Sequence, residues 1–135
     1  MGDQSPLVRV VEQDVPAVGT AGNDASTIVC QAPFDGTVTA VQLVPLSAIT
    51  GADTNSRTVA LTNKGQAGSG STSMASLALT NGVNAAADDE KAVTLSGTPA
   101  NLAVAAGDTL LWTSTHVGTG ITDPGGLVRV TFSRS

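Results

Sequence analysis

Aromatic and charged residues are scarce in this chain of 135 residues. Aromatic side chains make up 2% of it, with no tyrosine, and charged side chains make up 13%, which is about half the usual share of charge. A core must therefore be built from valine, leucine, isoleucine and alanine, with threonine at half-buried sites. Because so little charge would leave a monomer with an unusually plain surface, we expect partners to cover part of it.

Cysteine and histidine are also rare, long apolar runs are missing, and each of these features argues against a class of function. The single cysteine, Cys30, excludes an internal disulfide, and the single histidine, His116, leaves little for a transition-metal site. A net charge of −5 and scattered basic residues argue against nucleic acid as a partner. No apolar run has the length of a membrane span, and the first residues lack the basic start and apolar core of a signal peptide.

No catalytic or metal-binding motif stands out. Asp88, Asp89 and Glu90 are consecutive, so their side chains diverge instead of facing each other as in a glycosidase, and the spacing of an EF-hand loop is missing. No Gly-x-Ser-x-Gly sequence supports a catalytic triad around His116. Cys30 is interpreted as a small half-buried apolar residue. We therefore expect no catalytic residue, no cofactor, no metal and no small-molecule substrate in a protein that is not an enzyme.

Short segments with period-two alternation fill most of the chain. In residues 57–62, Val59 and Leu61 share one side, and in residues 127–132, Val128, Val130 and Phe132 do so. Clusters of Gly, Pro, Asn and Asp separate these segments. About eight strands at this spacing predict one all-β domain, an antiparallel, jelly-roll-like β-sandwich. Residues 85–89 predict at most a single helical turn.

Residues 101–117 carry the only tryptophan. One side of the expected strand carries Leu110, Trp112 and Ser114, and the other carries Leu111, Thr113 and Thr115. Because both sides begin with an apolar residue, we expect burial on both, with the second side against another copy of the chain. Trp112 is interpreted as a core anchor, and His116 with the loop 118–126 as the rim.

The first 25 residues are predicted to form an extended N-terminal arm and a connection, and residues 26–135 the sandwich domain. Residues 7–11 form a short apolar strand with Arg9 on its polar face, and residues 12–24 contain Pro16 and two glycines, as is typical of an irregular connection. Two interpretations stay open for this part: an arm that extends from the domain, or an edge strand followed by a loop.

Three stretches, residues 32–65, 64–80 and 105–132, together resemble small β-sandwich proteins from the heads of tailed bacteriophages. These are the head decoration, or cement, proteins and related minor capsid proteins. The resemblance implies a virion protein that is made in the host cytoplasm and binds the outer face of an expanded capsid, often as a trimer at local threefold positions. There it would bridge major capsid subunits and stabilise the shell against the pressure of the packaged DNA.

The resemblance supplies no functional residues, so the contact surfaces are predicted from the residues themselves. We expect contact with the major capsid protein through Leu7, Val8, Arg9, Val10 and Val11, and contact between copies of a homotrimer through Leu111, Thr113, Leu127 and Arg129. The alternative is a fibre or adsorption domain that binds a host-surface glycan. It would place Trp112, His116 and the loops 64–73 and 118–126 at an exposed tip.

Overall fold

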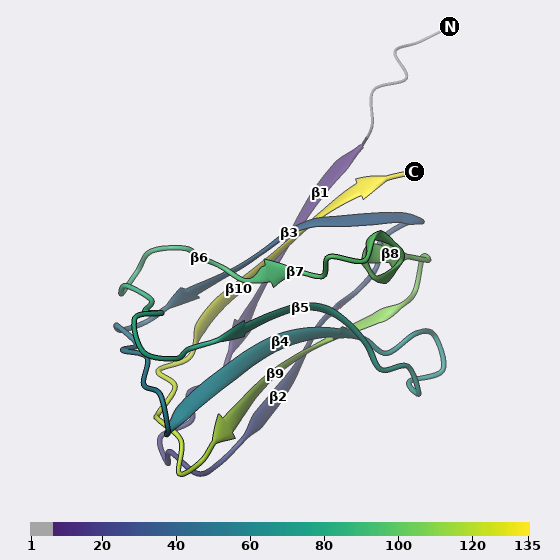
Figure 1. The fold of residues 1–135 in the computed structure, drawn as a ribbon. Helices are drawn as coiled ribbons and strands as arrows, with labels where there is room; N and C mark the ends of the chain where they lie inside the picture. Colours follow the sequence, from purple (N-terminus) through teal and green to yellow (C-terminus); the bar gives the residue numbers. More distant parts are fainter. Residues whose placement is uncertain (1–6) are drawn as a thin grey trace, which may run out of the picture.

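Two antiparallel β-sheets packed face to face form the molecule (Figure 1). The computed structural model describes residues 7–135. Its strands are β1 (Val8–Val15), β2 (Ala25–Gln31), β3 (Gly36–Pro45), β4 (Ser56–Asn63), β5 (Thr72–Ala78), β6 (Lys91–Ala92), β7 (Thr94–Leu95), β8 (Ala103–Val104), β9 (Thr109–Val117) and β10 (Gly126–Arg134). One 3-10 helix, η1 (Pro99–Leu102), is the only helix in this part of the chain, and residues 85–89 contain none.

The strands pair in a nested order. One sheet, called the β1 sheet below, runs β1-β10-β3-β6, and β8 also pairs with β3; the other, the β2 sheet, runs β2-β9-β4-β5-β7. β1 thus pairs with β10, β2 with β9, β3 with β8, and β4 with β5. This is the order of a jelly roll, in which a long antiparallel hairpin folds across itself. The predicted all-β antiparallel sandwich is confirmed, and its ten strands occupy eight positions of the nested order.

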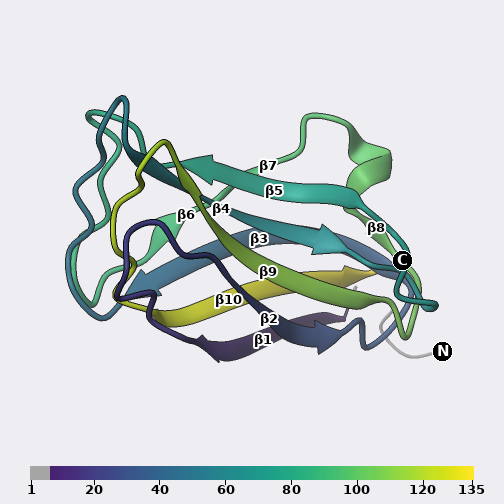
Figure 2. The same cartoon turned by 90° about the horizontal axis from the view of Figure 1, so that it is seen from below.

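The sixth of these eight positions along the chain, made of β6, β7 and β8, is interrupted. Residues 91–104 pair first with β3 through β6, then with β5 through β7, and again with β3 through β8. Figure 2 shows β5 and β7 along one side of the sandwich and β1 and β2 along the other. The interrupted strand therefore bridges the gap between the sheets on the β5 side, and β1 and β2 remain edge strands on the opposite side.

Alternation along the strands builds the core, as expected from the sequence. The inward side chains of β3, β4, β9 and β10 are fully or almost fully buried: Val38, Val41, Leu43, Val59, Leu61, Leu110, Trp112, Val128, Val130 and Phe132. Trp112 is 2% exposed, which confirms it as a core anchor. Phe34 packs edge-on against Phe132 with ring centroids 6.4 Å apart. Apart from these three rings, the core is aliphatic.

The N-terminal strand is part of the sandwich. β1 pairs with β10 along its whole length, from Val8 opposite Ser133 to Val15 opposite Gly126, and Val15 is buried in the core. The structure therefore shows the edge strand and loop, and the expected arm over residues 1–25 is wrong for residues 8–15. The boundary at residue 25 separates no independent unit. The first six residues of the expected arm lie outside the described residues.

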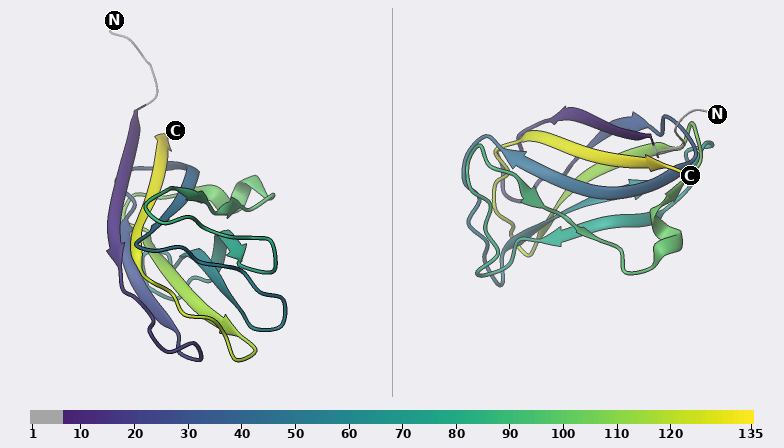
Figure 3. Two further views of the ribbon diagram at one scale, coloured as in Figure 1. Left: turned by 90° about the vertical axis from the view of Figure 1, so that its left-hand side faces the viewer. Right: turned by 90° about the horizontal axis from the view of Figure 1, so that it is seen from above.

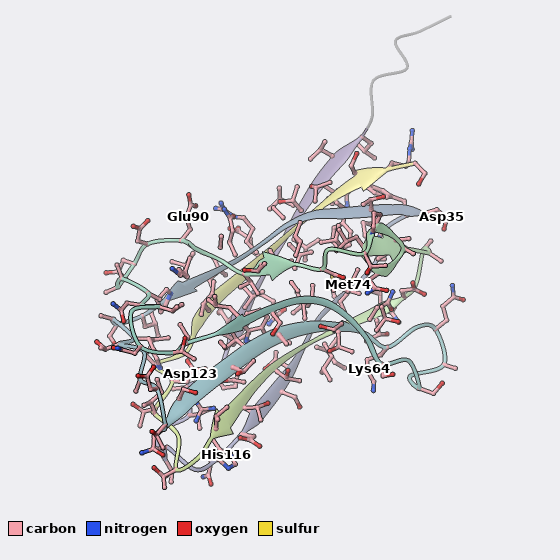
Figure 4. All side chains as sticks on the ribbon, viewed as in Figure 1. Asp35, Lys64, Met74, Glu90, His116 and Asp123 are labelled. Atoms are coloured by element: carbon pink, nitrogen blue, oxygen red, sulfur yellow. The ribbon has the colours of Figure 1, made fainter. Side chains whose placement is uncertain are left out.

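Two sets of connections occupy the two ends of the sandwich (Figure 3). Residues 16–24, 46–55, 79–90 and 118–125 gather at one end, called the His116 end below. Residues 32–35, 64–71 and 105–108 gather at the Lys64 end, together with the start of β1 and the C-terminus. Figure 4 labels His116, Asp123 and Glu90 near the first end, and Lys64 and Asp35 near the second.

A buried arginine ties the connections at the His116 end together. Arg57, on β4, is 0% exposed. Its guanidinium donates to the carbonyl oxygens of Ala21, Asn23 and Ile121 at 2.8–3.0 Å, and to the hydroxyl of Ser114 at 3.1 Å. Both connections that it holds pass from one sheet to the other, β1 to β2 and β9 to β10. Arg57 therefore fixes where the two sheets join.

A carboxylate balances this buried charge through one hydroxyl group. Ser114 donates to Asp123 Oδ2 at 2.6 Å, and Asp123 Oδ1 accepts from the amide of Gly125 at 2.8 Å. Ser114 and Asp123 are both buried. Every buried side-chain nitrogen or oxygen within residues 7–135 has a hydrogen-bond partner, so the network is complete, as a buried polar network must be to be tolerated.

Replacing Arg57 by methionine is expected to lower the free energy of unfolding by about 3–5 kcal/mol, because three backbone carbonyls and the Ser114 hydroxyl lose their donor in the interior and the buried Asp123 carboxylate loses its nearby positive charge. Urea denaturation followed by the fluorescence of Trp112, the only tryptophan, measures the effect. Arg134→Met is the control, since Arg134 is exposed and its loss should change stability by about 0.5 kcal/mol or less. Equal midpoints for the two variants would contradict the role given to Arg57.

Candidate interaction surfaces

The outward positions of the strands in the β2 sheet carry no charged side chain; Lys64, which follows β4, lines a hollow with Ile28 and Leu111 at one end of this surface. The outward positions alternate with the buried ones and form three rows across the strands: Ile28, Leu111, Thr62 and Ser73; Ser26, Thr113, Ala60 and Ser76; and Thr115, Thr58 and Ala78. These residues are called the uncharged face below. Among the described residues, no connection crosses the middle of this face (Figure 2). It presents methyl groups and hydroxyls on a broad sheet surface.

The sequence of the four long strands explains this face. β2, β5 and β9 contain no Asp, Glu, Lys or Arg, and the single charge of β4 is Arg57, which points inward. Ile28 is 61% exposed on it, beside the half-buried Leu111. A face with so many β-branched and small residues and no charge resembles the centre of a protein interface, where charged residues are depleted.

The outer surface of the β1 sheet differs in its charge. Arg129, in the middle strand β10, is surrounded by Glu12 at 3.2 Å, Glu90 at 3.6 Å and Gln42 at 3.5 Å. Each of these side chains comes from a different segment, so Arg129 links β1, β3 and the connection before β6. Because all three charged side chains are partly exposed, each ion pair adds little to stability, and their main effect is to make this surface polar.

The four residues predicted to join copies fall on opposite faces. Leu111 and Thr113 lie on the uncharged face, whereas Leu127 and Arg129 lie on the outer surface of the β1 sheet. The structure therefore does not bring them into one patch. A closed trimer needs two patches inclined toward a common axis, and two parallel, opposite faces would stack copies in a line instead.

The residues predicted to contact a capsid lie on and beside β1. Leu7, Val8 and Val10 are exposed, with 39%, 58% and 48% of their surfaces accessible, and Val8 and Val10 share the outer side of the edge strand. Arg9 and Val11 have the other parity, and Val11 packs against the core. The structure thus groups three of the five residues as an exposed apolar strip at the Lys64 end.

The arrangement required for a glycan-binding tip is not present. Trp112 lies between the sheets, where a sugar ring cannot stack on it. Loops 64–73 and 118–126 lie at opposite ends of the sandwich, because they follow the C-terminal ends of antiparallel neighbours β4 and β9. Trp112, His116 and the two loops therefore cannot form one exposed site, and this part of the expectation is wrong.

His116 forms a short polar contact with Asp24 at its end of the molecule. Its Nδ1 lies 2.6 Å from Asp24 Oδ1, and its backbone amide donates to the same oxygen at 2.8 Å. These contacts, first the backbone amide and then the ring, hold the pKa of Asp24 below its usual value. The pair joins the start of β2 to the end of β9, so His116 ties elements together at the rim of the sandwich.

Other groups with potential chemistry are held in structural roles. Burial raises the pKa of Cys30 to about 11, so the thiol stays protonated at neutral pH and is a poor nucleophile. Asp108 accepts from the amide of Ala105 and from Asn63, and these bonds lower its pKa and shape the turn before β9. Within residues 7–135, no three His, Cys, Asp or Glu side chains are grouped so that they could hold a metal ion.

The part of the chain described by the structure has no helix with the length and hydropathy needed to cross a membrane. Comparison of the chain with protein-family models, with curated protein sequences and with solved structures finds no match.

Sequence reasoning missed two features of these surfaces. Arg57 has the same parity as Val59 and Leu61, and Ser114 the same as Trp112, so alternation alone could have placed both inside. A groove beside Leu46, described below, is the other feature. It depends on which strands become neighbours, and no local pattern reveals that.

The Asp24 contacts predict a pH dependence of stability. Because the folded state lowers the pKa of Asp24, the charged carboxylate stabilises the fold above its unfolded pKa of about 3.9, and this contribution is lost as the pH falls through the lower folded value. Asp24→Asn should therefore be less stable than the wild type at pH 7, and the difference should shrink below about pH 4. Urea titrations at several pH values measure it.

His116→Ala provides the matched comparison. It removes the ring but keeps the backbone amide, which is the largest cause of the lowered pKa, so the Asp24 carboxyl should still titrate below its usual value in this variant. Carbon-detected NMR of the carboxyl group follows it directly. An Asp24 pKa at or above the usual value in the wild type would contradict the assignment.

Proposed function

We propose that this chain is a non-enzymatic structural protein of a phage virion, which decorates the outside of the capsid and stabilises it by bridging major capsid subunits. The observation that carries the proposal is the contrast between a broad uncharged face and a polar opposite face on one jelly-roll sandwich. That contrast suits a protein covered on one side by copies of itself and attached elsewhere to a shell. The resemblance of residues 32–132 to head decoration proteins supports the same function.

Copies associate, in this proposal, as a homotrimer in which the uncharged face, with Leu111 and Thr113, supplies one of the two patches that each copy needs. Each copy carries a net charge of −5, so copies repel unless they meet where charge is missing. The uncharged face provides such a place, and its small side chains allow a neighbouring copy to approach closely. Leu127 and Arg129, on the other face, then stay available for other partners.

The exposed strip of Leu7, Val8 and Val10 makes the contact with the shell. Val8 and Val10 have no intramolecular reason to be apolar, because they lie on the outer side of an edge strand, and Leu7, just before that strand, is exposed as well. β1 also keeps one unpaired edge in the sandwich. An exposed, apolar edge strand is a usual site for contact with another chain. Since many copies bind only the assembled shell, they stabilise it by mass action.

Mixing the purified protein with undecorated heads of the encoding phage tests the proposal. We expect stoichiometric binding and a higher temperature of DNA release. Val10→Glu should weaken binding at least about tenfold, because it places a charge in an apolar contact. Ala100→Glu is the control, since Ala100 is exposed on η1 at the opposite side of the sandwich. Wild-type protein that neither binds nor protects heads would refute the proposed function.

Two threonine variants test which face joins the copies. Thr113 and Thr131 are both half-buried residues in the middle of long strands, β9 and β10, on opposite faces. Thr113→Lys should convert the trimer to a monomer in sedimentation velocity, because it buries an unpaired charge between copies. Thr131→Lys should leave the trimer intact. The opposite pattern would assign the contact to the β1 sheet.

A further inference from the structure

Leu46 is the most exposed large apolar side chain among residues 7–135, with 69% of its surface accessible. It borders a groove of about 420 Å³ at the His116 end of the β1 sheet, and the groove is also lined by Val44, Leu127, Gly126, Asp14 and Asp88. This Leu46 groove has an apolar floor and two carboxylates at its rim. Neither the fold nor the contacts between copies accounts for it.

Backbone contacts fix the walls of the groove in place. Asp14, Leu127 and Val44 are direct neighbours across β1, β10 and β3. The amide of Leu46 donates to the carbonyl of Gly125 at 3.0 Å, and the amide of Asp88 donates to the carbonyl of Pro45 at 2.8 Å. The groove is therefore preorganised, and a ligand would not have to order it.

The charged residues that line the groove are of one sign. No basic residue lines it, and within the described chain neither carboxylate accepts a hydrogen bond or forms an ion pair. Arg129, in the same strand as Leu127, is already shared between Glu12 and Glu90. Asp14 and Asp88 thus line the groove without a basic residue beside them, and the net charge of −5 keeps the potential of the molecule negative.

We propose that the Leu46 groove receives an arginine side chain of the capsid shell. Its methylene stem would pack on Leu46, Val44 and Leu127, and its guanidinium would lie between the carboxylates of Asp14 and Asp88. An arginine combines an apolar stem with a weakly hydrated, always charged head, which matches an apolar floor with acidic rims. That the arginine belongs to the capsid shell rests on the proposed function. That the groove binds an arginine side chain does not depend on it.

The groove is tested first with a small probe on the full-length protein. N-acetyl-arginine-N′-methylamide, titrated to tens of millimolar, should shift the NMR amide signals of Leu46, Asp88 and Leu127, and the shifts should weaken with added salt. The citrulline analogue, which has the same shape without the charge, should shift them much less. Equal shifts from both compounds, or none at these amides, would overturn the inference, as would stronger shifts from calcium chloride alone.

Variants then test the groove on the capsid. Asp14→Asn and Asp88→Asn should each weaken binding to undecorated heads about fivefold, as expected for one partly exposed charge contact, and asparagine tolerates the positive φ of 59° at residue 88. Asp53→Asn, an exposed acid outside the groove, is the control for net charge. Wild-type binding that neither groove variant weakens refutes the arginine contact alone, whereas absence of wild-type binding refutes the proposed function.

Discussion

The guanidinium of Arg57 is the interaction on which the rest of this sandwich depends. From inside the β2 sheet it holds two of the four connections that pass between the sheets at the His116 end, the one from β1 to β2 and the one from β9 to β10. Hydrogen bonds continue from Arg57 through Ser114 and Asp123 to the amide of Gly125. The carbonyl of Gly125 in turn accepts a hydrogen bond from the amide of Leu46. One buried guanidinium thus holds connections between the two sheets and is linked by hydrogen bonds to one wall of the Leu46 groove on the outside.

The two sheets divide the chemistry of the surface between them. The long strands of the β2 sheet carry no outward charge, whereas the β1 sheet and its neighbouring connection carry Arg129 within a group of carboxylates. Both sheets share one aliphatic core, so the difference concerns only the outward residues. A molecule of this kind has one side suited to contact without charge and one suited to contact with basic groups, although its composition as a whole looks merely poor in charge.

Sequence reasoning predicted the sandwich because alternation is a local property, and Trp112, Val128 and Phe132 show it clearly. Alternation says which side of a strand faces inward, but it does not say which sheet the strand joins. For that reason Leu111 and Leu127 were assigned to one contact although they lie on opposite faces. The same limit made residues 7–11 equally compatible with an arm or an edge strand, because pairing with β10, more than a hundred residues away, decides it. Composition counts Arg57 only as one of several scattered basic residues, whereas its parity with Val59 indicates that it is buried.

The nested order also controls the time course of folding. β1 pairs only with β10, so during synthesis the first strand has no partner until the last has left the ribosome, about ten seconds later at typical elongation rates. Sheets built from such distant pairs fold slowly. β10 lies between β1 and β3, so its detachment must break two ladders at once. Folded copies therefore open rarely, and their persistence is governed by a rate as much as by an equilibrium.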